Sequence, residues 1–320
     1  MPQAGIGGYG VAERSTPFIS VVVPTYNRAA HLERQLHWLF GELSALTVSW
    51  EVCVHDNCST DDTPAVTAKW QHTFGPGRLR VVRNRANIGG IPNLAAALAD
   101  ARGRWVWSVG DDDDIVDGTT AHVVDLLRSQ PDLALLYLNF RGVDVAGVET
   151  NEHYFDPAVS GRIEDGRQAF MYHSGQDLGS VIFLTATVYR TELVQDAMRS
   201  WKGEIDNWAL VAYWTGYVAA RGPVYITPEI VIDCLVGVSH WSAEPGAYIK
   251  AVYADIPKVF LRLNHEGYPK EFCQRVGYEK LKRRVRWRSL KNHVQALYYC
   301  PKFILTLTAL AALHQRSTIE

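Results

Sequence analysis

The first half of the chain alternates short apolar runs with segments in which apolar residues recur at helical spacing. Continuous runs rich in β-branched residues are typical of strands that are buried on both faces of a parallel sheet. Such runs predict strands at residues 18–24, 51–55, 79–83, 105–109 and 133–140. Between them, apolar stripes predict helices after residue 28, from Pro92 onward and at 119–129. The alternation predicts an α/β fold with a mainly parallel sheet sandwiched by helices.

The second half is more mixed. Apolar runs predict strands at 182–190, 224–227 and 230–236, and helical patterns cover 208–221 and 246–264. In parallel sheets, ligands bind beyond the carboxyl ends of the strands, so the loop after each early strand is a candidate site. Those loops are polar: they read TYNR, DNCSTDD, RNRANIGG and GDDDD.

Composition excludes some classes of protein. The 320 residues carry a formal net charge of -2, which lacks the basic surplus of a nucleic-acid binder. Five cysteines are too few and too scattered for a disulfide framework, and the N-terminus has no signal-peptide pattern. We therefore expect a cytoplasmic protein. Cys53 and Cys58 flank His55, but two of these residues lie in a predicted buried strand, which argues against a zinc site there.

Four consecutive aspartates, Asp111 to Asp114, follow the strand at 105–109. Like charges this close repel one another, and a hard divalent cation such as Mn²⁺ or Mg²⁺ would relieve the repulsion. A cation held there could clamp a diphosphate and stabilise it as a leaving group. The alternative interpretation is a solvated acidic turn that precedes a helix.

The four loops together resemble a known family. VVVPTYNR, HDNCSTDDT, RNRANIGGIPN and VGDDDDIVDG are similar, in order and spacing over residues 18–118, to the family-two inverting glycosyltransferases of the GT-A fold. Further on, YLNFRGV, the run 182–190, IDNW and GVSHW resemble the branch of abequosyltransferase-like enzymes of bacterial surface polysaccharides. The resemblance implies transfer of a sugar, with inversion, from a nucleotide-diphosphate sugar to an acceptor hydroxyl.

The resemblance also implies residue roles. Asp56 would accept a hydrogen bond from the base, Asn57 and Ser59 would shape its turn, and Asp113 would bind the metal. Asp111 or Asp112 would face the ribose, because the run is one carboxylate longer than the common motif and its register is open. The remaining donor-binding residues would be Pro24, Thr25, Tyr26, Asn27, Arg28, Asn87, Gly89, Gly90 and Asn93.

Two further roles fall in the second half. Asp206 in EIDNW is our choice as catalytic base, with Glu204 as the alternative. The purely structural interpretation is that Asp206 is an ordinary helix cap. His240 in SHW is a candidate metal or phosphate contact, although a histidine beside a tryptophan is more often structural.

We expect a flexible tail at 1–17, a GT-A domain at 18–240 and a helical C-terminal extension at 241–320. The domain would divide into a nucleotide-binding half, 18–118, and an acceptor half, 119–240. In the extension, residues 275–291 hold eight Lys or Arg and one acid, and an apolar run broken by Pro301 follows at 294–313. This pattern suits the surface of an anionic bilayer. Because enzymes of the family that the chain resembles often act on lipid-linked acceptors, the resemblance implies contact of 275–313 with the inner face of the cytoplasmic membrane, near a saccharide or lipid-linked saccharide acceptor. The alternative is a helix pair packed on the core or in a dimer.

Two rival functions stay open at this point. A nucleotide-sugar binding protein without turnover would keep the acidic loop and lack an active base, and assays of transfer or donor hydrolysis would distinguish it. A sugar nucleotidyltransferase would normally carry a Gly-rich basic loop after the first strand, where this chain has PTYNR.

Overall fold

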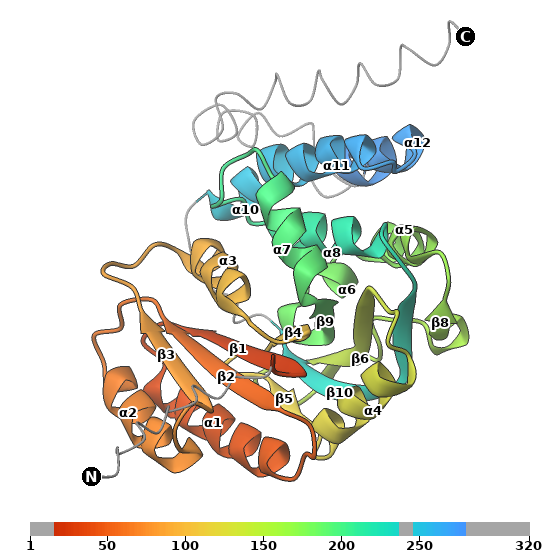
Figure 1. Cartoon of the computed structure of the whole chain (residues 1–320). Coiled ribbons are helices and arrows are strands. Elements are labelled where there is room, and N and C mark those ends of the chain that lie inside the picture. Colours follow the sequence, from red (N-terminus) through yellow and green to blue (C-terminus); the bar gives the residue numbers. More distant parts are fainter. Residues whose placement is uncertain (1–15, 237–245, 280–320) are drawn as a thin grey trace, which may run out of the picture.

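The computed structural model describes residues 16–236 and 246–279. Within these residues the chain forms one ten-stranded mixed sheet with helices on both faces (Figure 1), which confirms the α/β class. The strands that form its main path, in spatial order, are β3 (Leu79–Arg83), β2 (Trp50–Asp56), β1 (Ile19–Thr25), β4 (Trp105–Ser108), β9 (Thr187–Arg190), β6 (Leu135–Val143), β10 (Val224–Leu235) and β5 (Asp114–Ile115). Two short strands, β7 (Glu149–Asn151) and β8 (Gly161–Ile163), pair with β6 and β10.

The first four strands, β1 to β4, are parallel, as their apolar sequences predict. β1 is central, and pairs on one side with β2 and on the other with β4. Every residue of β2 is buried, because helices cover the sheet on both sides. One face is covered by α1 (Ala29–Ser44), α2 (Thr63–Phe74) and α4 (Thr119–Ser129), and the other by α3 (Gly90–Asp100), α7 (Thr191–Ser200) and α8 (Leu210–Ala219).

The predicted strand at 182–190 is only partly correct. Strand pairing begins at Thr187, and the preceding residues form two short helices, α6 (Gly179–Ile182) and a 3₁₀ turn at Leu184–Ala186. The turn is held by tertiary hydrogen bonds: the indole of Trp107 donates to the carbonyl of Thr185 at 2.8 Å. Such bonds come from a distant strand, so the apolar pattern of the segment cannot reveal them.

The two strands predicted at 224–227 and 230–236 form a single strand, β10, with register shifts against β6 between Ile226 and Ile232. Pro228 lies at the irregularity and has no N–H for the ladder. The hydroxyl of Thr227 accepts the hydrogen bond from the backbone N–H of Asn139 at 2.8 Å. The chain therefore stays in the sheet across a position where the sequence indicates a break.

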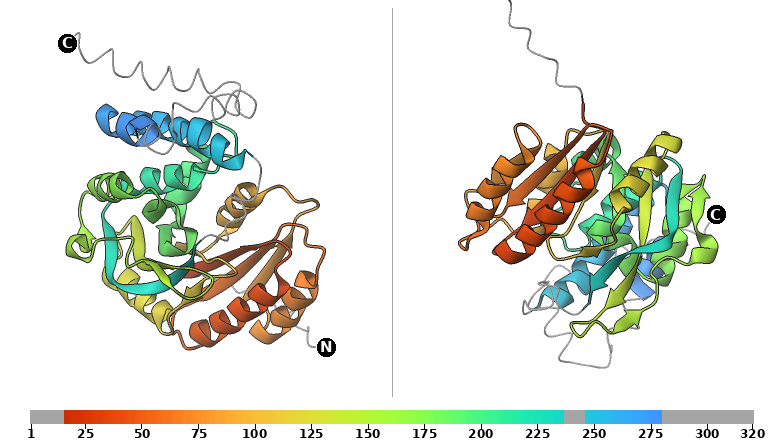
Figure 2. Two further views of the ribbon diagram at one scale, coloured as in Figure 1. Left: turned by 180° about the vertical axis from the view of Figure 1, so that it is seen from behind. Right: turned by 90° about the horizontal axis from the view of Figure 1, so that it is seen from below.

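The described part of the C-terminal extension is helical. The segment predicted as one helix at 246–264 is α10 (Ala247–Lys250), a π-helical stretch at Ala251–Asp255 and α11 (Ile256–His265), followed by α12 (Lys270–Gln274). These helices pack outside α8 and away from the sheet, as Figures 1 and 2 show from opposite sides. Val276, in the π-helical stretch Arg275–Glu279, is also buried, so this stretch belongs to the helical layer.

None of the described helices is both long enough and apolar enough to cross a membrane. Two further described helices are α5 (Gly166–Gln176), which also packs on α8, and a 3₁₀ turn at Pro157–Val159.

Candidate active site

The loops after β1, β2 and β3 lie together at the carboxyl edge of the sheet. Each contains one residue in the left-handed region: Asn27 (φ 52°), Cys58 (φ 66°) and Gly89 (φ 94°). The Asn27 carboxamide accepts from the backbone N–H of Thr60 at 2.7 Å, and this bond joins the first loop to the second. Backbone in this sparsely populated region persists where surrounding contacts fix it, and such positions concentrate at ligand sites.

Asn57 connects the second loop to the third. Its amide nitrogen donates to the Asn87 side chain at 2.7 Å and to the carbonyl of Gly89 at 3.2 Å, and its oxygen accepts from Asn84 at 3.0 Å. Asn93, buried at the start of α3, donates to the carbonyl of His55 at 3.0 Å. The amide side chains thus fix Gly89, which directly precedes the first residue of α3, Gly90.

Asp56 ends β2 and is buried. One of its oxygens accepts from the backbone N–H of Ser59 at 2.8 Å, and the other lies 3.5 Å from Nε of Arg83. Pro24 and Thr25 end β1 next to it, paired with His55 and Asp56, and Tyr26 is exposed beyond them. The residues predicted to bind the donor in the first three loops are therefore neighbours along one edge.

The acidic loop turns alternate carboxylates in opposite directions. Asp111 and Asp113 are buried, at 6% and 8% exposure, whereas Asp114 is exposed. Asp111 accepts from the Thr25 hydroxyl at 2.6 Å, and Asp112 pairs with Arg28. The two inward carboxylates are spaced as in Asp-X-Asp, which favours Asp111 and Asp113 as the functional pair.

Thr185 is a site residue that sequence reasoning missed. Its hydroxyl donates to Asp113 and accepts from the backbone N–H of Gly110 at 2.9 Å. There is no room for a side chain at position 110, because a Cβ there would lie 2.3 Å from Oδ2 of Asp113. The only local signal was a polar residue within an apolar run, and that signal is too common to identify a site.

Replacing Thr185 with Val is expected to raise the Mn²⁺ concentration needed for half-maximal binding by about tenfold. The hydroxyl fixes one oxygen of Asp113, and hydrogen bonds to charged groups contribute about 1.5–3 kcal/mol. Thr185→Ser, which keeps the hydroxyl, should bind Mn²⁺ like the wild type. Calorimetric titration with Mn²⁺ would measure both variants, and equal affinity in the Val variant would contradict the positioning role.

The charge of the inward carboxylates is only partly compensated, because Arg28 lies 3.4 Å from Asp111 and Thr185 bonds Asp113. Burial, together with the neighbouring carboxylates, raises the pKa of Asp111 to about 6 and that of Asp113 to about 7. Their threonine partners oppose the shift without cancelling it. Oxygen donors with excess negative charge suit a hard divalent cation, so the residues present are compatible with Mn²⁺ or Mg²⁺.

The loop that contains Glu204 and Asp206 lies at the same edge of the sheet. β9 runs antiparallel to β4, with Arg190 beside Trp105, and therefore ends where the parallel strands begin. α7 returns from there alongside α3, and α8 leads back to the start of β10. The connection 201–209 between α7 and α8 is thereby directed to the carboxyl edge, where the acidic loop lies.

Glu204 and Asp206 are both exposed and both paired with lysines of the C-terminal helices. Oδ2 of Asp206 lies 2.8 Å from Nζ of Lys250, and Oε2 of Glu204 lies 2.9 Å from Nζ of Lys258. Asp255, buried in the π-helical stretch, accepts from the backbone N–H of Trp208 at 3.0 Å and anchors this loop. The structure does not separate the two candidate bases, and His240 lies outside the described residues.

Comparison with known proteins identifies a matching protein family. The model of the family described as "Glycosyl transferase family 2" matches residues 20–196. The abequosyltransferase RfbV of Salmonella typhimurium is 32% identical over 136 residues, which are 42% of this chain and 40% of that protein. The matched part spans less than half the length of the curated relatives.

Two solved structures share the fold over most of the chain. TarS residues 1–349 of S. aureus in complex with UDP-GlcNAc gives a TM-score of 0.62 at 20% identity, and covers 92% of this chain and 83% of that one. The mannosyltransferase PcManGT from Pyrobaculum calidifontis, in complex with GDP-Man and Mn²⁺, gives a TM-score of 0.52 at 18% identity, with 95% and 87% coverage.

Proposed function

This chain belongs to glycosyl transferase family 2, with the GT-A fold expected from its sequence, and we propose that it transfers a sugar from a nucleotide-diphosphate sugar to an acceptor hydroxyl with inversion. The observation that carries the proposal is the convergence of the acidic loop with the Thr25–Arg28 segment at the carboxyl edge of the sheet. The diphosphate of a donor needs positive charge beside it, and its nucleobase needs a binding site next to that charge.

In this proposal Asp113 holds Mn²⁺ or Mg²⁺, and Asp111 or Asp112 faces the ribose. The cation, when bound, neutralises the diphosphate and makes it a better leaving group. Asp56 accepts a hydrogen bond from an N–H of the base, which suits uracil or guanine. Both bases occur in the donors named in the two similar structures. Gly89 and Gly90 let the backbone approach the ribose and diphosphate because they have no Cβ.

Asp206 is proposed as the general base, with Glu204 as the alternative. It takes the proton from the acceptor hydroxyl while that oxygen attacks the anomeric carbon. The bond from this carbon to the diphosphate oxygen breaks on the opposite face, which inverts the configuration. The acceptor is a saccharide or lipid-linked saccharide, and the pathway is bacterial surface polysaccharide or another glycoconjugate, by analogy with the named relatives.

Nucleotide diphosphates should stabilise the protein only when Mn²⁺ is present. We expect either UDP or GDP to raise the melting temperature, by the equivalent of about 2.7 kcal/mol at 100 times the dissociation constant. Thermal unfolding with each nucleotide, in Mn²⁺ and in EDTA, measures this. An equal shift in EDTA would contradict the metal role, and no shift with any nucleotide would contradict the donor site. Donor hydrolysis or transfer then separates an enzyme from a binding protein.

Membrane contact is proposed for residues 275–313. In the part of this segment that the structure describes, Arg275 is exposed and Val276 is buried in the helical layer. Residues 280–291 hold seven Lys or Arg and no acid. The chain from 280 onward lies outside the described residues.

The full chain is expected to sediment with anionic vesicles at low salt and much less with neutral ones. Each basic residue near an anionic surface contributes about 1 kcal/mol at most, and salt screens it within about 10 Å at 0.1 M. A chain ending at Glu279 keeps Phe272 and Val276 in the core, and should lose vesicle binding while it still binds the donor. Retained binding by this shorter chain would contradict the proposal.

A further inference from the structure

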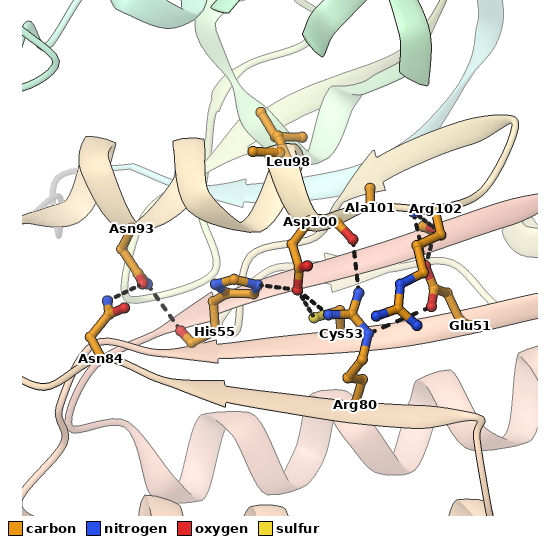
Figure 3. A network of polar contacts seen from close by, with 12 residues as sticks. Glu51, Cys53, His55, Arg80, Asn84, Asn93, Leu98, Asp100, Ala101 and Arg102 are labelled. Atoms are coloured by element: carbon orange, nitrogen blue, oxygen red, sulfur yellow. Dashed lines mark hydrogen bonds and ion pairs between the residues drawn. The ribbon is translucent and has the colours of Figure 1, made fainter.

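A second group of metal-ligating side chains lies between the sheet and α3 (Figure 3). Cys53 and His55 are two residues apart on β2, so their side chains are on the same face of the sheet. Asp100 is the last residue of α3, which packs across that face. One possible ligand atom from each of the three side chains lies within 4.8 Å of the others.

The spacing of these atoms matches a tetrahedral site. Zinc binds sulfur at about 2.3 Å and nitrogen or oxygen at about 2.0–2.1 Å, so tetrahedral angles place N and O about 3.3 Å apart and S and O about 3.6 Å apart. Nε2 of His55 lies 3.4 Å from Oδ2 of Asp100, and Sγ of Cys53 lies 3.7 Å from the same oxygen. The third spacing, between Cys53 and His55, is within 4.8 Å.

His55 supplies a second, independent observation. Its side chain is 2% exposed, and within the described residues Nε2 has the 3.4 Å ion-pair contact with Asp100 but no hydrogen bond, while Nδ1 has no partner. A buried polar atom without a partner costs about 1–3 kcal/mol, so Nδ1 needs an explanation. Burial also lowers the pKa of His55, and the neutral imidazole is the form that binds metals.

The charges around the cluster leave room for a cation. Arg80 pairs with Asp100 and lies 3.8 Å from Glu51. The carboxylates of Glu51 and Asp100 and the guanidinium of Arg80 together carry a formal charge of -1. A divalent ion bound to the Cys53 thiolate would add a formal charge of +1, so the cluster would become neutral. Nη2 of Arg80 also donates to the carbonyl of Asp100 at 2.9 Å. Nη1 of Arg80 bonds Oδ2 of Asp100, the oxygen that faces Cys53 and His55, so an ion must share this oxygen with Arg80 while the bond to the carbonyl keeps Arg80 beside the carboxylate.

We propose that Cys53, His55 and Asp100 bind one divalent transition-metal ion of the zinc type, with water as the fourth ligand. The sequence argued against a zinc site formed by Cys53, His55 and Cys58. In the structure the third member of the cluster is not Cys58 but Asp100, which is 47 positions from Cys53. The Asp100 side chain, at 36% exposure, provides the entry path. The Cys53 thiol loses its proton to solvent on binding. The ion ties the end of α3 to β2, and it is independent of the proposed catalytic metal.

Cobalt substitution in the full-length chain tests the proposal. With excess Mg²⁺ present to occupy the acidic loop, one equivalent of Co²⁺ should produce a thiolate-to-cobalt charge-transfer band in the near ultraviolet. Cys53→Ser, a change of one atom, should remove the band and weaken Co²⁺ binding by at least about tenfold. Loss of a residue that only supports a metal ligand already weakens binding about tenfold, so loss of the ligand itself should cost no less. Cys58→Ser and Cys234→Ser, which alter thiols outside the cluster, should keep the band.

Zinc should raise the melting temperature of the wild type and of Cys58→Ser, but not that of Cys53→Ser. Absence of the band in the wild type overturns the proposal regardless of how the variants fold. A band that survives in Cys53→Ser places the ion on another thiol and also overturns it. In either case Arg80 alone neutralises Asp100, and the cluster is a hydrogen-bonded network that fastens α3.

Discussion

Asp113→Asn is expected to abolish sugar transfer and, in the same protein, to stabilise the metal-free fold. Asp113 is buried, and among the described residues the Thr185 hydroxyl is its one hydrogen-bond donor. The amide has the same shape but no charge, so it cannot hold a divalent cation against solvent. Because a metal clamp contributes several kcal/mol to the transition state, we expect a loss in turnover of at least about 10³. Full activity in the variant, or in EDTA, would contradict the metal assignment.

The gain in stability has a definite pH dependence. The folded-state pKa of Asp113 is about 7, whereas the ordinary pKa of an aspartate is 3.8, so the wild type carries a destabilising buried charge above pH 7. The cost declines as pH falls from 7 and is absent below the unfolded pKa, where the carboxyl is protonated in both states. Each unit corresponds to about 1.4 kcal/mol, so Asp113→Asn should gain about 1–4 kcal/mol above pH 7.

Urea unfolding in EDTA from about pH 4 to pH 8 measures this gain. The difference between variant and wild type should widen with pH and level off above 7. A variant that is less stable than the wild type at pH 8 would mean that the fold already compensates the charge. Adding Mn²⁺ should then stabilise the wild type and leave the variant unchanged, which separates metal binding from folding.

Asp206→Asn is expected to lower the turnover rate by about 10²–10⁴, the usual contribution of a general base, while donor affinity stays unchanged. Its side chain is exposed and paired with Lys250 at 2.8 Å. Exposed ion pairs of this kind contribute about 0–1 kcal/mol to stability, so the loss of rate cannot come from unfolding. Single-turnover measurements with saturating donor would isolate the chemical step.

Glu204→Gln is the matched control, because Glu204 is equally exposed and also paired with a lysine, at 2.9 Å. It should retain nearly full turnover. If Glu204→Gln shows the loss and Asp206→Asn does not, the base lies two residues upstream. If neither variant loses rate, the connection 201–209 does not supply the base.

The sequence predicted the parallel half of the sheet well because its signals are local. The β-branched runs at 79–83 and 105–109 match β3 and β4 to within one residue, and the helix predicted at 119–129 has the bounds of α4. Buried strands and amphipathic helices each repeat over a few residues, so a short window contains the whole signal. The order of the polar loops followed from the rule that parallel strands end at one edge.

What the sequence could not predict depends on partners far along the chain. The hydroxyl of Thr185 reaches Asp113 across 72 positions, and it does so from a 3₁₀ turn that the apolar pattern presents as strand. Asp100 joins Cys53 across 47 positions. The sequence also could not predict which aspartates of the acidic loop point inward, because four identical residues contain no periodicity. Only the contacts with Thr25, Arg28 and Thr185 distinguish them.

The position of β9 has a consequence for how the chain reaches its fold. β9 lies between β4 and β6 and is antiparallel to both, with Tyr189 beside Val106 on one side and beside Leu135 on the other. A nascent chain that has completed β4 therefore keeps an open strand edge until about 80 more residues have emerged. Contacts of such long sequence separation make folding slow, and open edges invite association with other chains. The first half, although it contains all the donor loops, is thus expected to expose the unpaired edge of β4 when it is excised.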